Sequence, residues 1–158
     1  MNLILWRHAE AEDNAANDLA RQLTTKGRKQ AQRVAKWLRT RVGDDAVILA
    51  SPAARTIQTA EALTDQYRVV RDLAPGASAR QVLAAAGWPH GLGPTVVVVG
   101  HQPTLGEVAS QLLDGDPERS LPMKKGALLW FASRESHGNQ PGEEEAAMLI
   151  AAMSPDMV

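Results

Sequence analysis

Residues 95–99, Thr-Val-Val-Val-Val, are the strongest strand signal in this chain. All five are β-branched and no alternation with polar residues occurs, so both faces of the strand are expected to be buried, as in a parallel sheet. The apolar runs at residues 2–6 and 46–50 have the same character, and helical patterns follow them. This β-α alternation predicts an α/β fold, a three-layer α/β/α sandwich around a mostly parallel sheet.

Apolar spacing and capping residues predict four helices and three further strands. Ser51 is expected to cap the second helix, with Pro52 as its first residue and with Ile57 and Ala60 buried. The last two strands are expected to form an antiparallel hairpin at one edge, joined by a polar loop that contains Glu143–Glu145. Helices are predicted from Thr24 or Thr25 to about Arg41, at residues 51–63 and 78–86, and from Pro103 onwards, and strands at residues 67–71, 127–133 and 146–153.

Composition bounds the class of protein. With 158 residues and 44% apolar content, residues 1–158 are expected to form a single globular domain with a substantial core. A formal net charge of −1 argues against nucleic acid or an anionic membrane as partner. The absence of cysteine excludes disulfides and thiolate metal sites. Since no apolar run reaches the ~18 residues of a membrane span and no signal peptide is recognisable, a cytoplasmic location is predicted.

Three of the predicted strands are followed by residues suited to binding an anion. The first ends in Arg7-His8, the second leads through Ser51-Pro52 to Arg55, and the strand at residues 95–99 leads to Gly100-His101. The carboxyl ends of parallel strands lie on one edge of the sheet, where ligands bind in open α/β folds. Helix N-termini direct N–H groups and partial positive charge at the same space. The sequence therefore predicts a phosphate site at this edge.

The side chains at this edge also suggest a reaction. Arg7 and Arg55 can each bind two phosphate oxygens, and neither has an acidic neighbour in the sequence. Two guanidinium groups disfavour protonation of His8, which leaves a nitrogen lone pair able to attack phosphorus. His101 is expected to donate a hydrogen bond to the equatorial oxygens or to place charge beside them.

Four sequence blocks resemble the histidine phosphatase superfamily, whose fold is phosphoglycerate mutase-like. They are Ile-x-x-Arg-His-x-x-Ala at residues 4–11 with its apolar strand, Arg-x-Leu-Thr-x-x-Gly at 21–27, Ser-Pro-x-x-Arg-x-x-Gln-Thr at 51–59 and His-x-Pro at 101–103. The short chain and the Arg-x-Leu-Thr segment resemble the SixA-type phosphohistidine phosphatases. The resemblance implies that His8 is the nucleophile and that Arg7, Arg55 and His101 bind the phosphoryl group. Arg21 is a further candidate for substrate binding, with an ion pair to Asp18 on the loop as the alternative.

The chain departs from the family pattern at two places. Ala9 follows the histidine where the family usually has glycine, which is tolerable only if the backbone does not need a positive φ and no ligand atom crowds the methyl group. Residues 71–78 contain no glutamate, although many members carry an acid after the third strand. A phosphate ester needs such an acid for its leaving group, whereas a phosphoramidate does not. Asp72 is the candidate replacement.

The predicted activity is therefore hydrolysis of phosphohistidine, or of another phosphoryl–nitrogen bond, through a covalent phospho-His8 intermediate. The alternatives are a phosphatase of small phosphate esters and a catalytically weak phosphate-binding regulatory module. No cofactor is expected, and a metal site of His8 with Glu10, Glu12 and Asp13 is disfavoured because Arg7 would repel the ion. The expected partner is a phosphorylated protein or small phosphorylated substrate, and the oligomeric state stays open.

Overall fold

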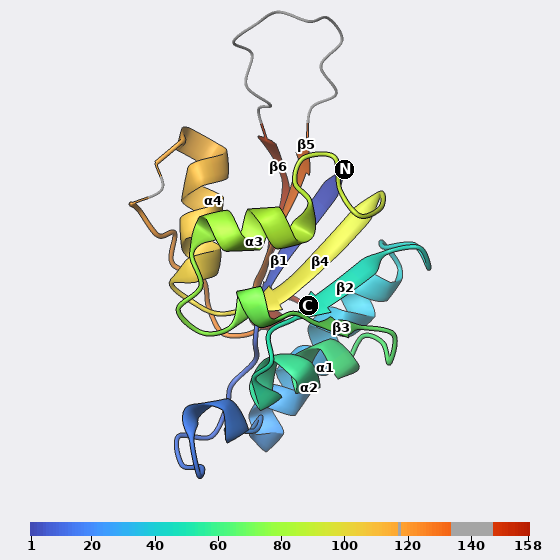
Figure 1. Cartoon of the computed structure of the whole chain (residues 1–158). Coiled ribbons are helices and arrows are strands. Elements are labelled where there is room, and N and C mark those ends of the chain that lie inside the picture. The colour runs from blue at the N-terminus through green and yellow to red at the C-terminus, as the bar shows by residue number, and fades with distance from the viewer. Residues whose placement is uncertain (117, 134–146) are drawn as a thin grey trace, which may run out of the picture.

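The computed structural model describes residues 1–116, 118–133 and 147–158. In this part of the chain six strands form one sheet in the order β3-β2-β4-β1-β5-β6 (Figure 1). The first four strands are parallel, and β5 and β6 form an antiparallel hairpin beside β1, as predicted. The strands are β1 (Asn2–Arg7), β2 (Val47–Ala50), β3 (Arg68–Val69), β4 (Thr95–Gly100), β5 (Leu128–Ser133) and β6 (Ala147–Met153).

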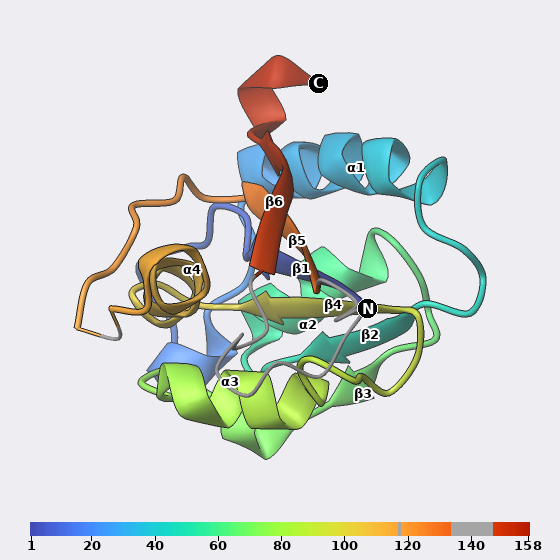
Figure 2. The ribbon, with the colours of Figure 1, turned by 90° about the horizontal axis from the view of Figure 1, so that it is seen from above.

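Helices cover both faces of the sheet, which confirms the predicted three-layer fold. One core lies between the sheet and α1 (Thr25–Arg39) with α2 (Ala54–Glu61). The other lies under α3 (Ala79–Ala86) and α4 (Thr104–Asp114). Figure 2 shows α1 on one side of the sheet and α3 on the other. Alternate residues of β1 and β4 enter opposite cores, which explains why their sequences are apolar throughout.

The helices α1 and α3 have side-chain caps at or beside their predicted starts, and the cap of α1 is Thr24, one of its two predicted capping residues. The Thr24 hydroxyl accepts a hydrogen bond from the Gly27 N–H at 2.9 Å, and α1 ends at Arg39, two residues before the predicted limit. Ser78 caps α3 in a capping box with Gln81. Pro103 is the N-cap residue of α4. These local hydrogen bonds are readable in the sequence because they join residues three positions apart.

The prediction for the start of α2 was wrong. The helix begins at Ala54, and its N-cap residue, Ala53, has no side chain that could cap it. The Ser51 hydroxyl accepts from the Ala53 N–H at 3.2 Å and faces His101 instead. The buried face also differs from the prediction, because Ile57 is only half-buried while two threonines and an arginine are buried with Ala60. Here α2 directs polar groups towards the interior, a use that apolar periodicity cannot reveal.

The sheet register brings the predicted site to one edge. Arg7 at the end of β1 lies opposite Gly100 at the end of β4, and Ala50 at the end of β2 lies opposite Val99. The segment after β1 (blue in Figure 1) extends from this same edge and carries the short 3-10 helix η1 (Asp18–Ala20), which contacts α2. The structure confirms a strand within residues 67–71, though it spans only two residues.

Two short 3-10 helices complete the described chain, η2 (Arg71–Leu73) after β3 and η3 (Pro155–Met157) after β6. The predicted loop with Glu143–Glu145 lies outside the described residues. None of the helices in the described ranges combines the length and the apolar character that crossing a membrane requires.

Candidate active site

His8 lies immediately after β1 and is almost fully buried, with 7% of its surface exposed. Main-chain hydrogen bonds hold it on both sides, because its N–H donates to the Gly100 carbonyl and its carbonyl accepts from the Gly126 N–H. The ring Nδ1 lies 2.7 Å from the Ala9 carbonyl oxygen. A carbonyl can only accept, so Nδ1 carries the proton and Nε2 of the neutral ring holds the lone pair.

Burial is the main reason that this ring is neutral. The pKa of His8 is lowered to about 4, mainly by desolvation and to a smaller extent by the charges of Arg55, Arg7 and Arg21, while the hydrogen bond to Ala9 opposes the change. The sequence argument named only the guanidinium groups, which are the smaller cause. At neutral pH the imidazole is therefore neutral, and its Nε2 is able to act as a nucleophile.

Arg7, the last residue of β1, has one guanidinium nitrogen that donates to the Met123 carbonyl at 2.7 Å. Its Nε atom is buried and has no hydrogen-bond partner among the described residues. A buried N–H donor without a partner is costly, so it is expected to face a ligand or water. Arg7 thus offers a donor beside His8 that the protein itself does not use.

Arg55 on α2 is 4% exposed, and it forms an ion pair that the sequence analysis did not foresee. Nη1 donates to the Asp18 main-chain oxygen at 2.8 Å, and Nη2 donates to the Asp18 carboxylate at 3.1 Å. This hydrogen bond with Arg55 is the main cause that lowers the pKa of Asp18. The Nε atom of Arg55, like that of Arg7, is buried and unpartnered in the described part of the chain.

His101 follows β4 and links Arg55 to Ser51. Its Nδ1 lies 3.4 Å from Nη2 of Arg55, which can only donate, so Nε2 carries the proton and donates to the Ser51 hydroxyl at 2.7 Å. Burial, then the charge of Arg55, lowers the pKa of His101 to about 3. The ring is therefore neutral at pH 7, and of the two expected roles it suits donation of a hydrogen bond. The His8 and His101 ring centroids are 5.4 Å apart.

Arg21 is connected to these residues through Asp18. Its guanidinium binds the Asp18 carboxylate at 3.2 Å and the Glu12 main-chain oxygen at 2.6 Å, and within the described residues no hydrogen bond joins it to His8 or Arg55. The alternative ion pair with Asp18 is thus present. The same carboxylate joins Arg21 to Arg55, so the two interpretations of Arg21 are connected through Asp18.

Ala9 fits its position without strain. No described residue other than glycine has a positive φ, so the backbone here does not require glycine. The methyl group is fully buried and packs with Leu23 and Ala31, and the Ala9 N–H donates to the Thr59 hydroxyl at 3.1 Å. The first condition for tolerating Ala9, a backbone without a positive φ, is therefore met, and the methyl group contacts apolar residues of the Leu23 segment and α1.

Two acidic residues considered from the sequence, Glu10 and Asp72, have different surroundings. The Glu10 carboxylate accepts a hydrogen bond from the Thr24 hydroxyl at 2.7 Å. Asp72, the candidate acid, is exposed on η2 and forms no hydrogen bond or ion pair with any site residue that the structure describes. Within the described ranges, no group of three or more histidine, aspartate or glutamate side chains is arranged to hold a metal ion.

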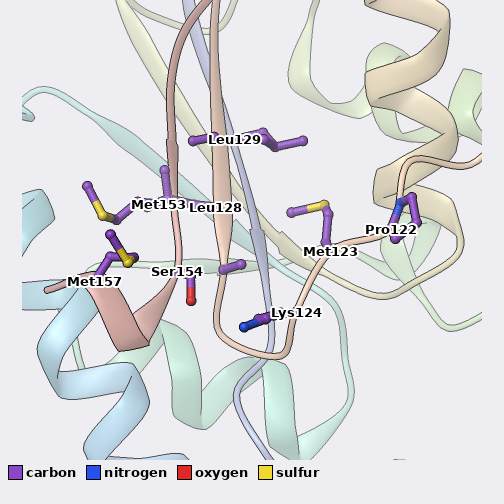
Figure 3. A pocket seen from close by; sticks show the side chains of 10 residues that line it. Pro122, Met123, Lys124, Leu128, Leu129, Met153, Ser154 and Met157 are labelled. Carbon is purple, nitrogen blue, oxygen red and sulfur yellow. The ribbon is translucent and has the colours of Figure 1, made fainter.

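A separate apolar hollow of about 250 Å³ lies between the segment before β5 and the end of β6 (Figure 3). Its lining includes Leu128, Met153 and Met157, and none of His8, Arg7, Arg55 or His101. Main-chain oxygens of two lining residues, Met123 and Ala127, connect it with the site by accepting hydrogen bonds from Arg7. Its apolar lining does not suit a phosphate group, so it is distinct from the candidate site.

The depressed histidine pKa values predict acid-sensitive stability. An unfolded histidine binds a proton below pH 6.5, whereas folded His8 stays neutral down to about pH 4. The unfolded state therefore binds more protons as the pH falls through this window, and the free energy of unfolding decreases. We expect the urea midpoint to fall from pH 7 to pH 5, and to fall less in His8→Asn. Equal decreases in both proteins would contradict the assignment to His8.

Comparisons with known proteins agree with this geometry. Residues 3–76 match the model of the histidine phosphatase superfamily (branch 1). Phosphohistidine phosphatase SixA of Escherichia coli is 30% identical over 147 residues, which cover 88% of this chain and 89% of that protein. A solved structure of the protein histidine phosphatase SixA complexed with tungstate superposes with a TM-score of 0.80 at 26% identity, covering 99% of this chain and 98% of that one. For a putative SixA from Nakamurella the TM-score is 0.78 at 27% identity, with 98% and 95% covered.

Proposed function

This chain belongs to the histidine phosphatase superfamily, branch 1, and on that premise we propose that it hydrolyses phosphohistidine or another phosphoryl–nitrogen bond through a covalent phospho-His8 intermediate. One observation carries the proposal. A buried, neutral His8 lies within the electrostatic influence of Arg7 and Arg55, each of which keeps a buried Nε–H without a partner among the described residues. Neutral imidazole supplies the nucleophile, and the two unused donors suit the oxygens of a phosphoryl group.

The reaction takes two displacements at phosphorus. The lone pair on His8 Nε2 forms a bond to phosphorus while the bond to the substrate nitrogen breaks, and the leaving imidazole or amine, already protonated in the substrate, departs with the electron pair as a neutral molecule. Water then attacks the phospho-His8 intermediate, which releases inorganic phosphate and restores the neutral imidazole. Arg7 and Arg55 bind the phosphoryl oxygens throughout. The Nε2–H of His101 donates to the Ser51 hydroxyl in the ligand-free site and exchanges this acceptor for a phosphoryl oxygen as negative charge develops there.

The surroundings of the carboxylates support a nitrogen leaving group. An alkoxide leaving group needs a protonated acid within hydrogen-bond reach, whereas a protonated imidazole or amine leaves without one. Asp18 is kept ionised by Arg55, and Glu10 is bound to the Thr24 hydroxyl. Neither group is placed as a free acid, which favours phosphoramidates over esters.

A comparison of two leaving groups tests this proposal. We expect kcat/KM for a phosphohistidine peptide or phosphoramidate to exceed that for the matching phosphoserine peptide or alkyl phosphate by about 100-fold or more, the usual contribution of a general acid. Steady-state phosphate release at pH 7 with the purified chain measures both. Faster cleavage of the ester would favour the small-ester phosphatase, and no turnover of any phosphorylated compound would favour a phosphate-binding module.

The expected partner is a phosphorylated molecule, and a phosphorylated protein is the favoured one. Three groups next to the site reach solvent, since the side chain of Asp18 is 56% exposed, that of Asp13 is 97% exposed and that of Arg21 is 26% exposed. These exposed groups offer a protein surface polar contacts beside the buried His8. Kinetic comparison of a phosphohistidine protein with free phosphohistidine tests the preference, and an equal kcat/KM for the two would contradict it.

A further inference from the structure

The ion pair between Asp18 and Arg55 uses a particular edge of the guanidinium group. A guanidinium offers its donors along two edges, a terminal edge formed by Nη1 and Nη2 and a lateral edge that includes Nε. Asp18 takes the terminal edge with two different acceptors, its main-chain oxygen on Nη1 and its carboxylate on Nη2. The guanidinium cannot rotate about its own bonds without breaking both hydrogen bonds.

The edge that Asp18 does not use carries an unpartnered donor. Nε of Arg55 is buried and has no partner among the described residues, while the adjacent Nη2 also reaches Nδ1 of His101 at 3.4 Å. The unpartnered Nε–H of Arg55 therefore lies on the lateral edge of the guanidinium, the edge that faces His101. Rotation about the Nε–Cζ bond would exchange only Nη1 and Nη2, whereas the direction of the Nε–H bond changes with the other torsions of the side chain, which the two hydrogen bonds to Asp18 restrain.

Asp18 is itself held in place. Arg21 binds the second oxygen of its carboxylate at 3.2 Å. The residue lies in the 3-10 turn η1, and the Asn17 side chain caps this turn by accepting from the Ala20 N–H at 3.0 Å. Asn17 forms no hydrogen bond with Arg55 in the described structure, so it supports the turn without touching the site. The chain thus provides a matched control for Asp18.

We propose that Asp18 is a positioning residue, which fixes the terminal edge of Arg55 so that the Nε–H donor stays directed at the phosphoryl oxygen. The inference rests on the proposed function only in assigning a phosphoryl group to Arg55. The opposite role would be competition, in which Asp18 occupies Arg55 in place of substrate. The two roles predict opposite signs, because removal of a positioning group slows turnover and removal of a competitor accelerates it.

Three variants separate orientation from charge and from loop stability. Asp18→Ala removes the carboxylate, and we expect kcat for a phosphoramidate to fall by about tenfold or more, since small misplacements of a binding group are costly. KM is not expected to rise, because a negative charge beside an anion site is lost as well. Asp18→Asn keeps an oxygen acceptor for Nη2, so its kcat is expected within about threefold of the wild type. Asn17→Ala is expected within about twofold.

Nuclear magnetic resonance of the arginine side chains gives a readout that does not depend on turnover. In the wild type we expect separate ¹⁵N signals for the two Nη atoms of Arg55, and a shift of its Nε–H signal on addition of inorganic phosphate. In Asp18→Ala the Nη signals are expected to merge, because rotation about the Nε–Cζ bond is no longer hindered. The spectrum of Arg55→Lys identifies the signals. Asn17→Ala is expected to keep the wild-type pattern.

The outcomes distinguish this inference from the proposed function. A higher kcat/KM in Asp18→Ala, or equal losses in Asp18→Ala and Asn17→Ala, would overturn the positioning role while wild-type turnover stood. A loss in Asp18→Asn as large as that in Asp18→Ala would overturn it too, since charge would then carry the effect. If the wild type cleaves no phosphoramidate, the proposed function fails. In that case the Arg55 Nη and Nε signals are the remaining test, and an Nε–H signal that does not shift on addition of phosphate overturns the inference.

Discussion

Replacing His8 with alanine is expected to lower phosphoramidate hydrolysis by about four orders of magnitude or more. Loss of a catalytic nucleophile has an effect of this size in other enzymes with covalent intermediates. The structure supports the expectation because His8 is the buried imidazole whose Nδ1 is bound to a carbonyl and whose Nε2 keeps the lone pair. Phosphate release under saturating substrate measures the loss.

Two further measurements make the His8 experiment specific. Acid-labile labelling of the wild type with ³²P-phosphoramidate is expected, and none is expected in His8→Ala. Inorganic phosphate is expected to bind the variant within about tenfold of the wild type, since Arg7 and Arg55 remain, and calorimetry tests this. His90→Ala, a change of an exposed histidine, serves as control and is expected to keep full activity. Turnover in His8→Ala above one per cent would refute the covalent intermediate.

Replacing Arg55 with alanine is expected to reduce kcat/KM by about 10³-fold. Charged donors that bind a transferring phosphoryl group contribute 10²- to 10⁵-fold in comparable sites. Arg55→Lys keeps the charge and loses the planar fork, so an intermediate loss of about 10²-fold is expected. The fold should survive either change, because the partner Asp18 is largely exposed and water can solvate its carboxylate. Thermal unfolding checks this.

The Arg55 variants also make a pH prediction with a defined sign. Arg55 is one of the charges that lower the pKa of His8, so its removal raises that pKa from about 4 towards the ordinary value. The neutral nucleophile is then lost at a higher pH, and the acid limb of the kcat/KM profile moves upwards in Arg55→Ala. Arg41→Ala is the matched control, since Arg41 lies over the Trp37 ring on α1, away from the site. An unchanged acid limb would show that Arg55 does not act on His8.

Much of the fold was predictable from local signals. The fully buried strand β4 is readable as a run of β-branched residues, and the helix starts at Thr24 and Ser78 as hydroxyls that reach backbone groups three residues ahead. The start of α2 was not predictable in this way. The Ser51 hydroxyl is within range of both the local N–H groups and the ring of His101, and only the folded sheet brings that ring close.

The candidate site divides in the same manner. The convergence of Arg7, Arg55 and His101 follows from their places after three parallel strands, which any parallel sheet brings to one edge. The partner of Arg55 was missed, because Asp18 lies 37 residues away in an irregular segment without periodic signal. Asp18 entered the sequence argument only as a neighbour of Arg21, three residues along the chain.

The sequence by itself therefore determined the order of strands and helices, the family and the identity of the residues that meet at the sheet edge. These depend on local hydrogen bonding, apolar patterning and the topology of parallel strands. Only the tertiary structure decided that burial lowers the pKa of His8, that Ala9 packs without strain and that Asp18 binds Arg55. Desolvation and long-range ion pairs depend on which side chains pack together in space, and spacing along the chain does not record that.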